Sequence, residues 1–397
     1  MAEKNLDFDT VIDRTHTNSL KYDFAVQRGE PKDVLPLWVA DMDFQVSSYI
    51  QEALAGSVAH GIFGYSEAAG SYFEAVAGWM GRHYGWNVEE PWLVKTPGIV
   101  FALAQAVRAF TEPGDAVLLQ QPVYYPFSQV IRDNGRKIVD NTLVQGEDGR
   151  YRIDFADFEE KIRSCKVKLF FLCNPHNPVG RVWTREELLR LGDICEKYGV
   201  IVVSDEIHAD FVFEGSHQVL AGLKESYRKF VVTCTAPSKT FNIASMMISN
   251  IFIPNRELKA KFRAQLDAAG ISQLNVLGLV ACEAAYAHGE EWYKAMHSYV
   301  ADNIAFTKEY VETQLPGVSM VDHEGTYLVW LDFRETGLSV DELEDLIVHR
   351  AKLWLDSGKI FGDCGKGFQR INVACPRATL QEALDRIKTA LQESKAQ

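Results

Sequence analysis

The chain has 397 residues, of which 47% are hydrophobic and 24% are charged, and its formal net charge is −13. This is the composition of a folded globular protein with room for one large and one smaller domain. The acidic balance argues against nucleic acid or an anionic membrane as a partner. No apolar run reaches the ~18 residues of a transmembrane helix, and the first residues, MAEKNLDFDT, lack an export signal. The seven dispersed cysteines form no C-x-x-C pair, which predicts a cytoplasmic protein with reduced thiols and no metal site.

The first 47 residues are polar and irregular apart from an apolar island at residues 35–40. We expect them to form an arm that packs against another part of the chain. Apolar residues at helical spacing follow up to Gly61, and a glycine-punctuated loop then presents Tyr65. The boundaries we expect are 1–47 for the arm, 48–288 for a large domain and 289–397 for a small one.

The middle of the chain alternates short apolar strands with helices. Seven strands are expected at 92–94, 116–119, from 138, 167–172, 200–203, 230–232 and 248–253. Helices are expected at 68–84, 101–110, 155–162 and 184–198, the last opened by a capping box of Thr184 and Glu187. This alternation predicts an α/β fold with a mostly parallel sheet between helices.

The last third of the chain changes pattern. It is largely helical from about 255 to 313, and strands at 319–321, 327–331 and 369–373 then accompany helices near 340–351 and 379–393. We expect a smaller α+β domain that the N-terminal arm joins.

A lysine follows the strand at 230–232, in the stretch TCTAPSKTFN. An ammonium group just beyond a core strand is costly to bury unpaired. It becomes reasonable if Lys239 forms a covalent imine with a carbonyl cofactor. The alternative is a surface lysine whose stem packs on the protein while its amine stays in water.

Polar residues follow two other strands, where ligands bind in such sheets. Two Asn-Pro steps in CNPHNPVG make a rigid turn that holds the amide of Asn177 at the sheet edge. Asp205 comes after four apolar residues and is desolvated there unless it meets a cation or hydrogen-bond donors.

Together these residues match pyridoxal 5′-phosphate (PLP), which needs a Schiff-base lysine and an acid at its pyridine nitrogen. Lys239 and Asp205 supply these two groups, Asn177 can bond the phenolic oxygen, and Tyr124 can stack on the ring, with Tyr125 as the alternative. A glycine turn at a helix N-terminus and nearby hydroxyls suit the phosphate. The phosphate ligands expected are Gly98, Ile99, Val100, Thr235 and Ser238.

The stretches NPHNPVG, SDEIHADF, APSKTFNIA and RINVACPR, in this order, resemble fold-type I PLP enzymes of the class I/II aminotransferase superfamily. The resemblance runs from about residue 30 to the end. PLWVADMDF, HGIFGY and DEIH further resemble the cystathionine β-lyase-like branch, the C–S lyases of the MalY/PatB type.

The resemblance implies an aspartate aminotransferase-like fold and a homodimer in which Tyr65 reaches the phosphate of the neighbouring subunit. It implies that Arg370 binds the substrate α-carboxylate, with Asn177 and the Ala40 backbone nearby. His208, where transaminases of the superfamily usually have tyrosine, is expected to donate to the phenolic oxygen or to Asn177. Arg377, His176 and Asp210 are interpreted as structural, and Cys173 and Cys234 as buried thiols.

Three residues depart from the family pattern. Ala236 replaces a frequent serine three residues before the lysine, Met247 replaces an arginine, and Ser245 replaces a glycine. We therefore expect the phosphate contact to shift to Thr235 or Ser238.

The reaction that the resemblance implies is β-elimination from L-cystathionine, L-cysteine or other S-substituted cysteines to give a thiol, pyruvate and ammonia. Lys239 removes the Cα proton, and Lys239 or a nearby tyrosine protonates the leaving thiolate, so Tyr124 and Tyr65 are also counted as catalytic. Two alternatives are an aminotransferase, which reprotonates the same carbanion at the cofactor, and a PLP-bound regulatory protein without turnover.

Overall fold

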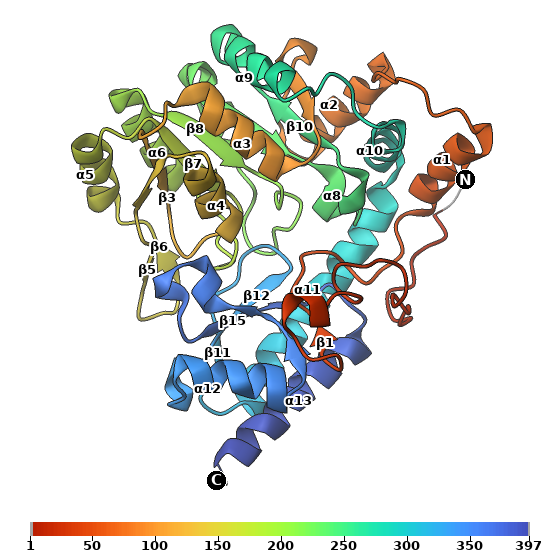
Figure 1. The fold of residues 1–397 in the computed structure, drawn as a ribbon, viewed down its shortest axis with the longest axis vertical. Helices are drawn as coiled ribbons and strands as arrows, with labels where there is room; N and C mark the ends of the chain where they lie inside the picture. The colour runs from red at the N-terminus through yellow and green to blue at the C-terminus, as the bar shows by residue number, and fades with distance from the viewer. Residues whose placement is uncertain (1–2, 396–397) are drawn as a thin grey trace.

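A seven-stranded sheet forms the centre of the upper half of the molecule in Figure 1, in the computed structural model, which describes residues 3–395. The strand order is β2-β10-β9-β8-β7-β3-β4, and β10 alone runs antiparallel to both of its neighbours. The strands are β2 (Leu93–Thr96), β3 (Ala116–Leu119), β4 (Lys137–Asp140), β7 (Leu169–Cys173), β8 (Ile201–Asp205), β9 (Val231–Thr235) and β10 (Ser249–Phe252).

The central strands are short continuous apolar runs because helices cover both faces of the sheet. Every residue of β3, β7 and β9 is buried. The helices of this half are α1 (Ser48–His60), α2 (Gly70–Tyr84), α3 (Ile99–Phe110), α4 (Tyr125–Asp133), α5 (Phe155–Cys165), α6 (Arg185–Tyr198), α7 (Leu220–Leu223), α8 (Pro237–Thr240), α9 (Arg256–Ala268) and α10 (Val276–His288). A small hairpin, β5 (Val144–Gln145) with β6 (Tyr151–Arg152), lies beside them.

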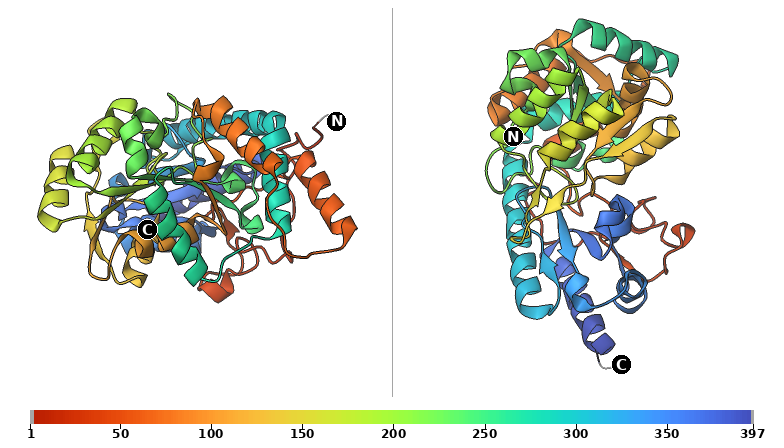
Figure 2. Two further views of the ribbon diagram at one scale, coloured as in Figure 1. Left: turned by 90° about the horizontal axis from the view of Figure 1, so that it is seen from above. Right: turned by 90° about the vertical axis from the view of Figure 1, so that its left-hand side faces the viewer.

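The lower half is built on an antiparallel four-stranded sheet in the order β11-β12-β15-β14. The long helix α11 (Glu290–Gln314) runs from the upper half along the lower one (Figure 2). The other elements are β11 (Ser319–Met320), β12 (Leu328–Asp332), α12 (Val340–Asp345), β13 (Leu353–Trp354), β14 (Asp356–Ser357), β15 (Phe368–Asn372) and α13 (Arg377–Lys395). From the N-terminal arm, β1 (Leu35–Pro36) pairs in parallel with β13.

The mostly parallel seven-stranded sheet and the smaller α+β region are as predicted. The capping box of Thr184 and Glu187 is present, and all seven cysteines are free. Strands β8 and β9 extend further than expected, so that Asp205 is the last residue of β8. The helix expected near 340–351 ends as α12 at Asp345 and continues as a π-helical turn, Leu346–Arg350. Within residues 3–395, no helix has the length and apolar character needed to cross a membrane.

Candidate active site

The carboxyl ends of β7, β8 and β9 meet at one edge of the sheet, because these strands are parallel neighbours. Their register places Asp205 between Cys173 and Cys234. The Asn-Pro turn follows β7, and α8 with Lys239 follows β9. The topology therefore brings Asn177, Asp205 and Lys239 to the same edge, as the strand-end argument predicts.

Lys239 lies in α8, a single helical turn that Pro237 opens. Its side chain is half-buried, and its Nζ donates to the carbonyl oxygen of Ala40 over 2.6 Å. Burial lowers the pKa of the Lys239 amine to about 8, with Arg370 adding to this effect and Asp41 and Asp205 opposing it. The amine is therefore far easier to deprotonate than an ordinary lysine, as a nucleophile or base must be.

Asp205 is 5% exposed, and the only hydrogen bond to its carboxylate among the described residues comes from the backbone N–H of Ile207, over 3.1 Å. Burial raises the pKa of Asp205 to about 7, although the Ile207 N–H and the charge of Lys239 act in the opposite direction. A buried carboxylate with so few donors is a site for a cation.

Arg370 reaches the same region from the small sheet, where it lies in β15 and is 3% exposed. Its Nη1 donates to Asn177 Oδ1 over 2.9 Å, and its Nη2 donates to the carbonyl of Trp38 over 2.9 Å. Its Nη2 also bonds the carboxylate of Asp356, which sits directly opposite it in β14. Its Nε is buried and has no hydrogen-bond partner within residues 3–395. Because Asn177 Oδ1 accepts from Arg370, its NH₂ group is left to donate elsewhere in the site.

Tyr124 precedes α4, and its backbone N–H donates to Asn177 O over 3.0 Å. Its ring centre lies 5.5 Å from that of Tyr125. Burial raises the pKa of Tyr124. The charge of Asp205 raises it further, whereas the charge of Arg370 lowers it. Both tyrosines thus stand at the site edge as neutral hydroxyl groups, and the choice between them as the stacking residue stays a prediction.

His208 is 3% exposed and lies among aromatic side chains. Its ring meets those of Tyr327 and Phe211 edge-on, with ring centres 5.9 and 6.4 Å apart. Its Nδ1 has no hydrogen-bond partner, and no hydrogen bond joins it to Asn177 among the described residues. Burial, helped by the charges of Lys239 and Arg370, holds the pKa of His208 well below its usual value, so the ring is neutral.

The residues expected at the phosphate lie around the start of α3, at the end of β9 and in α8. Gly98 has a φ of 99° and precedes the first turn of α3, which contains Ile99 and Val100. The Thr235 hydroxyl donates to the Asn250 carbonyl over 3.1 Å, so its proton is already used. Tyr65 is 99% exposed in the segment between α1 and α2.

The N-terminal arm closes the site from the other side. Asn242, three residues after Lys239, exchanges hydrogen bonds with the backbone of Met42, and Asn372 of β15 donates to the carbonyls of Val39 and Asp41. Ion pairs within the arm hold the segment next to Ala40 in shape. Arg14 and the fully buried Lys21 pair with Asp43, and Arg14 also pairs with Asp41.

Sequence reasoning missed Asp356, Tyr327 and Asn372. Asn372 and Arg370 are two residues apart on a predicted strand and so share a face, a signal that could have revealed Asn372. Asp356 and Tyr327 have no such signal, because only the pairing of β14 with β15 and the turn before β12 bring them to the site.

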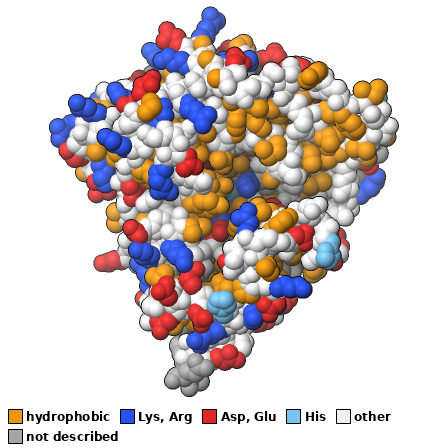
Figure 3. All heavy atoms as spheres, viewed as in Figure 1, with side chains coloured by type: hydrophobic (Ala, Val, Ile, Leu, Met, Phe, Trp, Pro, Cys, Tyr) orange, Lys and Arg blue, Asp and Glu red, His pale blue; other side chains and the backbone are white. Residues whose placement is uncertain are grey.

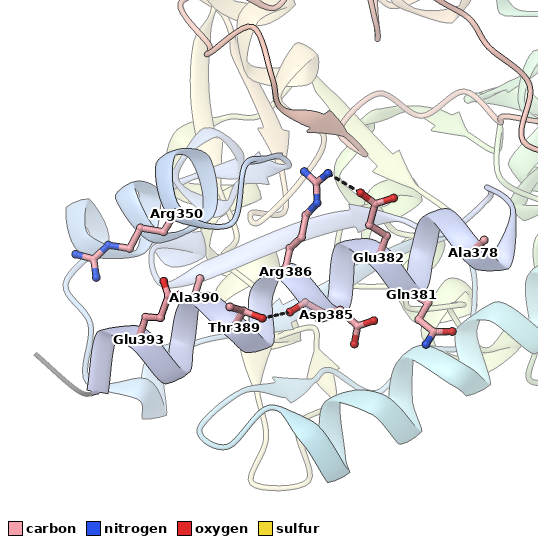
Figure 4. A pocket seen from close by; sticks show the side chains of 9 residues that line it. All are labelled: Arg350, Ala378, Gln381, Glu382, Asp385, Arg386, Thr389, Ala390 and Glu393. Carbon is pink, nitrogen blue, oxygen red and sulfur yellow. Dashed lines mark hydrogen bonds and ion pairs between the residues drawn. The ribbon is translucent and has the colours of Figure 1, made fainter.

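A cavity of about 600 Å³ borders Lys239 and lies between the arm and the segment after α8. Figure 3 shows hydrophobic side chains gathered on the face around this region. A second hollow of about 560 Å³ lies along α13 (Figure 4), where charged side chains such as Arg350, Glu382 and Arg386 line it. None of the residues predicted for the site borders this second hollow.

A model of the aminotransferase class I and II family matches residues 32–387. The chain belongs to this family. It is similar to cystathionine beta-lyase PatB of Bacillus subtilis, with 45% identity over 97% of this chain and 100% of that protein. Among solved structures, cystalysin of Treponema denticola, which contains a pyridoxal 5′-phosphate cofactor, matches with a TM-score of 0.94 and 37% identity over 98% of this chain and 99% of that one. The PLP-bound C–S lyase of Staphylococcus hominis matches with a TM-score of 0.90 and 33% identity over 97% and 98% of the two chains.

The residues present fit this cofactor. Asp205 is a buried carboxylate with no cation of the described residues at hydrogen-bond distance, and a protonated ring nitrogen would supply one. The unpartnered Nε of Arg370 and Nδ1 of His208 are further buried groups near Asp205 and Lys239 that a ligand could satisfy.

Proposed function

We propose that the protein is a PLP-dependent C–S lyase that cleaves L-cystathionine, L-cysteine or other S-substituted cysteines by β-elimination into a thiol, pyruvate and ammonia. The observation that carries the proposal is the meeting of Lys239, Asp205 and Arg370 at one sheet edge, in a chain similar over 97% of its length to a cystathionine β-lyase.

When bound, the cofactor supplies an electron sink for negative charge at the substrate Cα. Lys239 would hold the cofactor covalently, and Asp205 would keep its ring nitrogen protonated. Arg370 and Asn177 would orient the substrate through its α-carboxylate, and Tyr124 would pack against the ring. The amine of Lys239, once free, removes the Cα proton, which its lowered pKa favours at neutral pH.

The phosphate would be held by Ser238 and by the backbone N–H groups of Ile99 and Val100 at the start of α3, whereas the N–H expected from Gly98 already donates to the Thr96 carbonyl over 2.9 Å. Thr235 can contribute only as a supporting hydroxyl, since it donates to Asn250 O. Ala236 and Met247 offer no polar group, and His208 would donate to the phenolic oxygen from its neutral ring.

We further propose a homodimer with the active site shared across the interface, in which Tyr65 of one subunit reaches the phosphate of the other. A tyrosine that is 99% exposed, next to Ile62 and Phe63 at 73% and 59%, suits a surface that a second copy covers. Residues 48–288 and 289–397 would be the large and small domains of each subunit, with residues 1–47 as the arm. The seven free thiols suit a cytoplasmic location.

The test is to incubate the PLP-loaded protein with L-cystathionine and with S-substituted cysteines, and to assay free thiol and pyruvate. We expect both products from the wild type and neither from Lys239→Ala. If instead an added oxo acid becomes an amino acid while no thiol appears, the protein is an aminotransferase. If neither reaction occurs although PLP is bound, it is a regulatory PLP protein.

A further inference from the structure

Tyr327 is a fully buried tyrosine whose hydroxyl shares its hydrogen-bond acceptor with Lys239. The Tyr327 hydroxyl donates to the Ala40 carbonyl oxygen over 2.9 Å, and the Lys239 amine donates to the same oxygen over 2.6 Å. A carbonyl oxygen has two lone pairs, so these two donors saturate it. The position of the free lysine amine is therefore coupled to the tyrosine hydroxyl through a single atom.

The Ala40 carbonyl is held in place by the small sheet. The side chain of Asn372 donates to the Val39 carbonyl over 2.7 Å and to the Asp41 carbonyl over 2.6 Å, on both sides of Ala40. Because both neighbouring carbonyls are tied to β15, the Ala40 carbonyl cannot turn away from Lys239 without breaking these bonds.

The backbone before Tyr327 is strained. Thr326 has a φ of 72°, a conformation that a β-branched residue rarely adopts. It is held there by the hydrogen bond from its N–H to Phe211 O over 2.8 Å and by the ring of His323, which bonds its carbonyl over 2.8 Å. The turn places the Tyr327 ring against Phe211, with ring centres 4.7 Å apart, and next to His208. Strain of this kind persists where the surroundings enforce it, and it concentrates at functional sites.

We infer that Tyr327 is a positioning residue for the free amine of Lys239. By occupying one lone pair of the Ala40 oxygen, its hydroxyl leaves one fixed place to which the amine returns whenever it is not bonded to the cofactor. One amine hydrogen then stays on Ala40, and the nitrogen lone pair is free to accept the substrate Cα proton. This inference rests on the proposed function, in which the free amine is the base.

Removal of the hydroxyl has a predictable effect on Lys239. Without the Tyr327 donor, the Ala40 oxygen becomes a stronger acceptor for the ammonium form of the lysine. The other charged groups that act on the amine, Asp41, Asp205 and Arg370, are unchanged in Tyr327→Phe. The variant therefore protonates Lys239 more readily, and its amine is no longer confined to one lone pair of the Ala40 oxygen.

The experiment compares the wild type with Tyr327→Phe and uses Tyr310→Phe as the matched control, since Tyr310 donates to Asp385 at the surface, far along α11. The first readout is the pH dependence of PLP capture by the cofactor-free protein, followed by absorbance. We expect the midpoint of Tyr327→Phe to rise by about 0.5 pH unit or more, while that of Tyr310→Phe stays at the wild-type value. This readout requires no turnover, so it remains informative if the lyase proposal fails.

The second readout is turnover with substrate deuterated at Cα. We expect kcat of Tyr327→Phe to fall about tenfold with KM within about twofold, and the isotope effect to increase, because proton removal is slowed. Asn372→Ala releases the Val39 and Asp41 carbonyls on both sides of Ala40 and gives a second route to the same changes if Tyr327→Phe does not fold. An unchanged midpoint together with wild-type kcat in a folded variant would overturn the inference.

Discussion

Asp356 lies directly opposite Arg370 in the pairing of β14 with β15, and its carboxylate bonds Arg370 Nη2. The arginine proposed to bind the substrate carboxylate thus already carries a carboxylate from its own chain. Both side chains are buried, at 6% and 3% exposure, and burial raises the pKa of Asp356 although Arg370 opposes this. The pair partly neutralises the charge that attracts the substrate.

Asp356→Asn is therefore expected to strengthen substrate binding. The asparagine can keep the hydrogen bond, and Asn177 and Trp38 O still orient the guanidinium. We expect KM to fall about three- to tenfold, and the free energy of unfolding to fall by about 1–3 kcal/mol because the buried arginine loses its counter-charge. Steady-state kinetics and thermal melts measure the two effects. A higher KM at unchanged kcat would mean that Asp356 is needed to orient Arg370.

Lys239 should capture the cofactor with an unusually low pH midpoint. The neutral amine is the nucleophile, and burial lowers its pKa to about 8, so the capture rate should rise with pH and reach half its maximum near pH 8. Rates with n-propylamine over the same pH range correct for the titration of the cofactor itself, and Lys239→Ala should capture none. A midpoint near the ordinary lysine value of 10.5 would show that the amine is not desolvated.

Asp205→Asn should raise the stability of the cofactor-free protein and lower the activity of the loaded one. In the folded cofactor-free protein Asp205 holds its proton up to about pH 7, whereas an unfolded aspartate loses it near 3.8. Asp205 therefore lowers the free energy of unfolding increasingly as the pH rises from about 4, and the loss is complete above 7, where it amounts to a few kcal/mol at the most.

The cofactor-free Asp205→Asn variant should thus melt at a higher temperature than the wild type at pH 8 and at the same temperature near pH 4. The loaded variant should lose activity by about 100-fold or more, because nothing keeps the ring nitrogen protonated. A variant that is less stable at pH 8 would contradict the view that the Asp205 carboxylate is held there without a cation.

Hybrid dimers test the shared site. In a dimer of one Tyr65→Phe chain and one Lys239→Ala chain, one of the two sites has both an intact Lys239 and an intact Tyr65 from its partner. Random mixing in equal amounts makes half of the dimers hybrid. The mixture should therefore regain about a quarter of the wild-type activity per chain, although each parent has little. If the mixture is no more active than the average of its parents, Tyr65 does not act across the interface.

The architecture was largely predictable because its strands are short apolar runs, buried on both faces, between amphipathic helices. The meeting of Lys239, Asp205 and Asn177 at one edge was predictable for the same reason, since parallel strands end at one edge and all three residues follow or end such strands, whereas their roles stay predictions. Strand limits were less accurate. Thr235, for example, has a polar side chain but lies within β9, where its hydroxyl donates to the Asn250 carbonyl of the neighbouring strand β10.

The contacts made by the small sheet were not predictable. Asp356 faces Arg370 only because β14 and β15 pair in one register, and Tyr327 reaches Ala40 only through the positive φ of Thr326. Tyr327 and Ala40 are 287 positions apart in the chain. Neither hydrophobic periodicity nor local motifs carry information on pairing over that separation.

The most direct test of the proposed function is the identity of the carbon product that the PLP-loaded protein forms from L-cystathionine. β-Elimination breaks the C–S bond and gives pyruvate together with one equivalent of free thiol, without any added oxo acid. Transamination would leave the C–S bond intact and give an oxo acid that still contains sulfur. We predict pyruvate and thiol in a one-to-one ratio by mass spectrometry and thiol assay, and a sulfur-containing oxo acid as the main product would contradict the account.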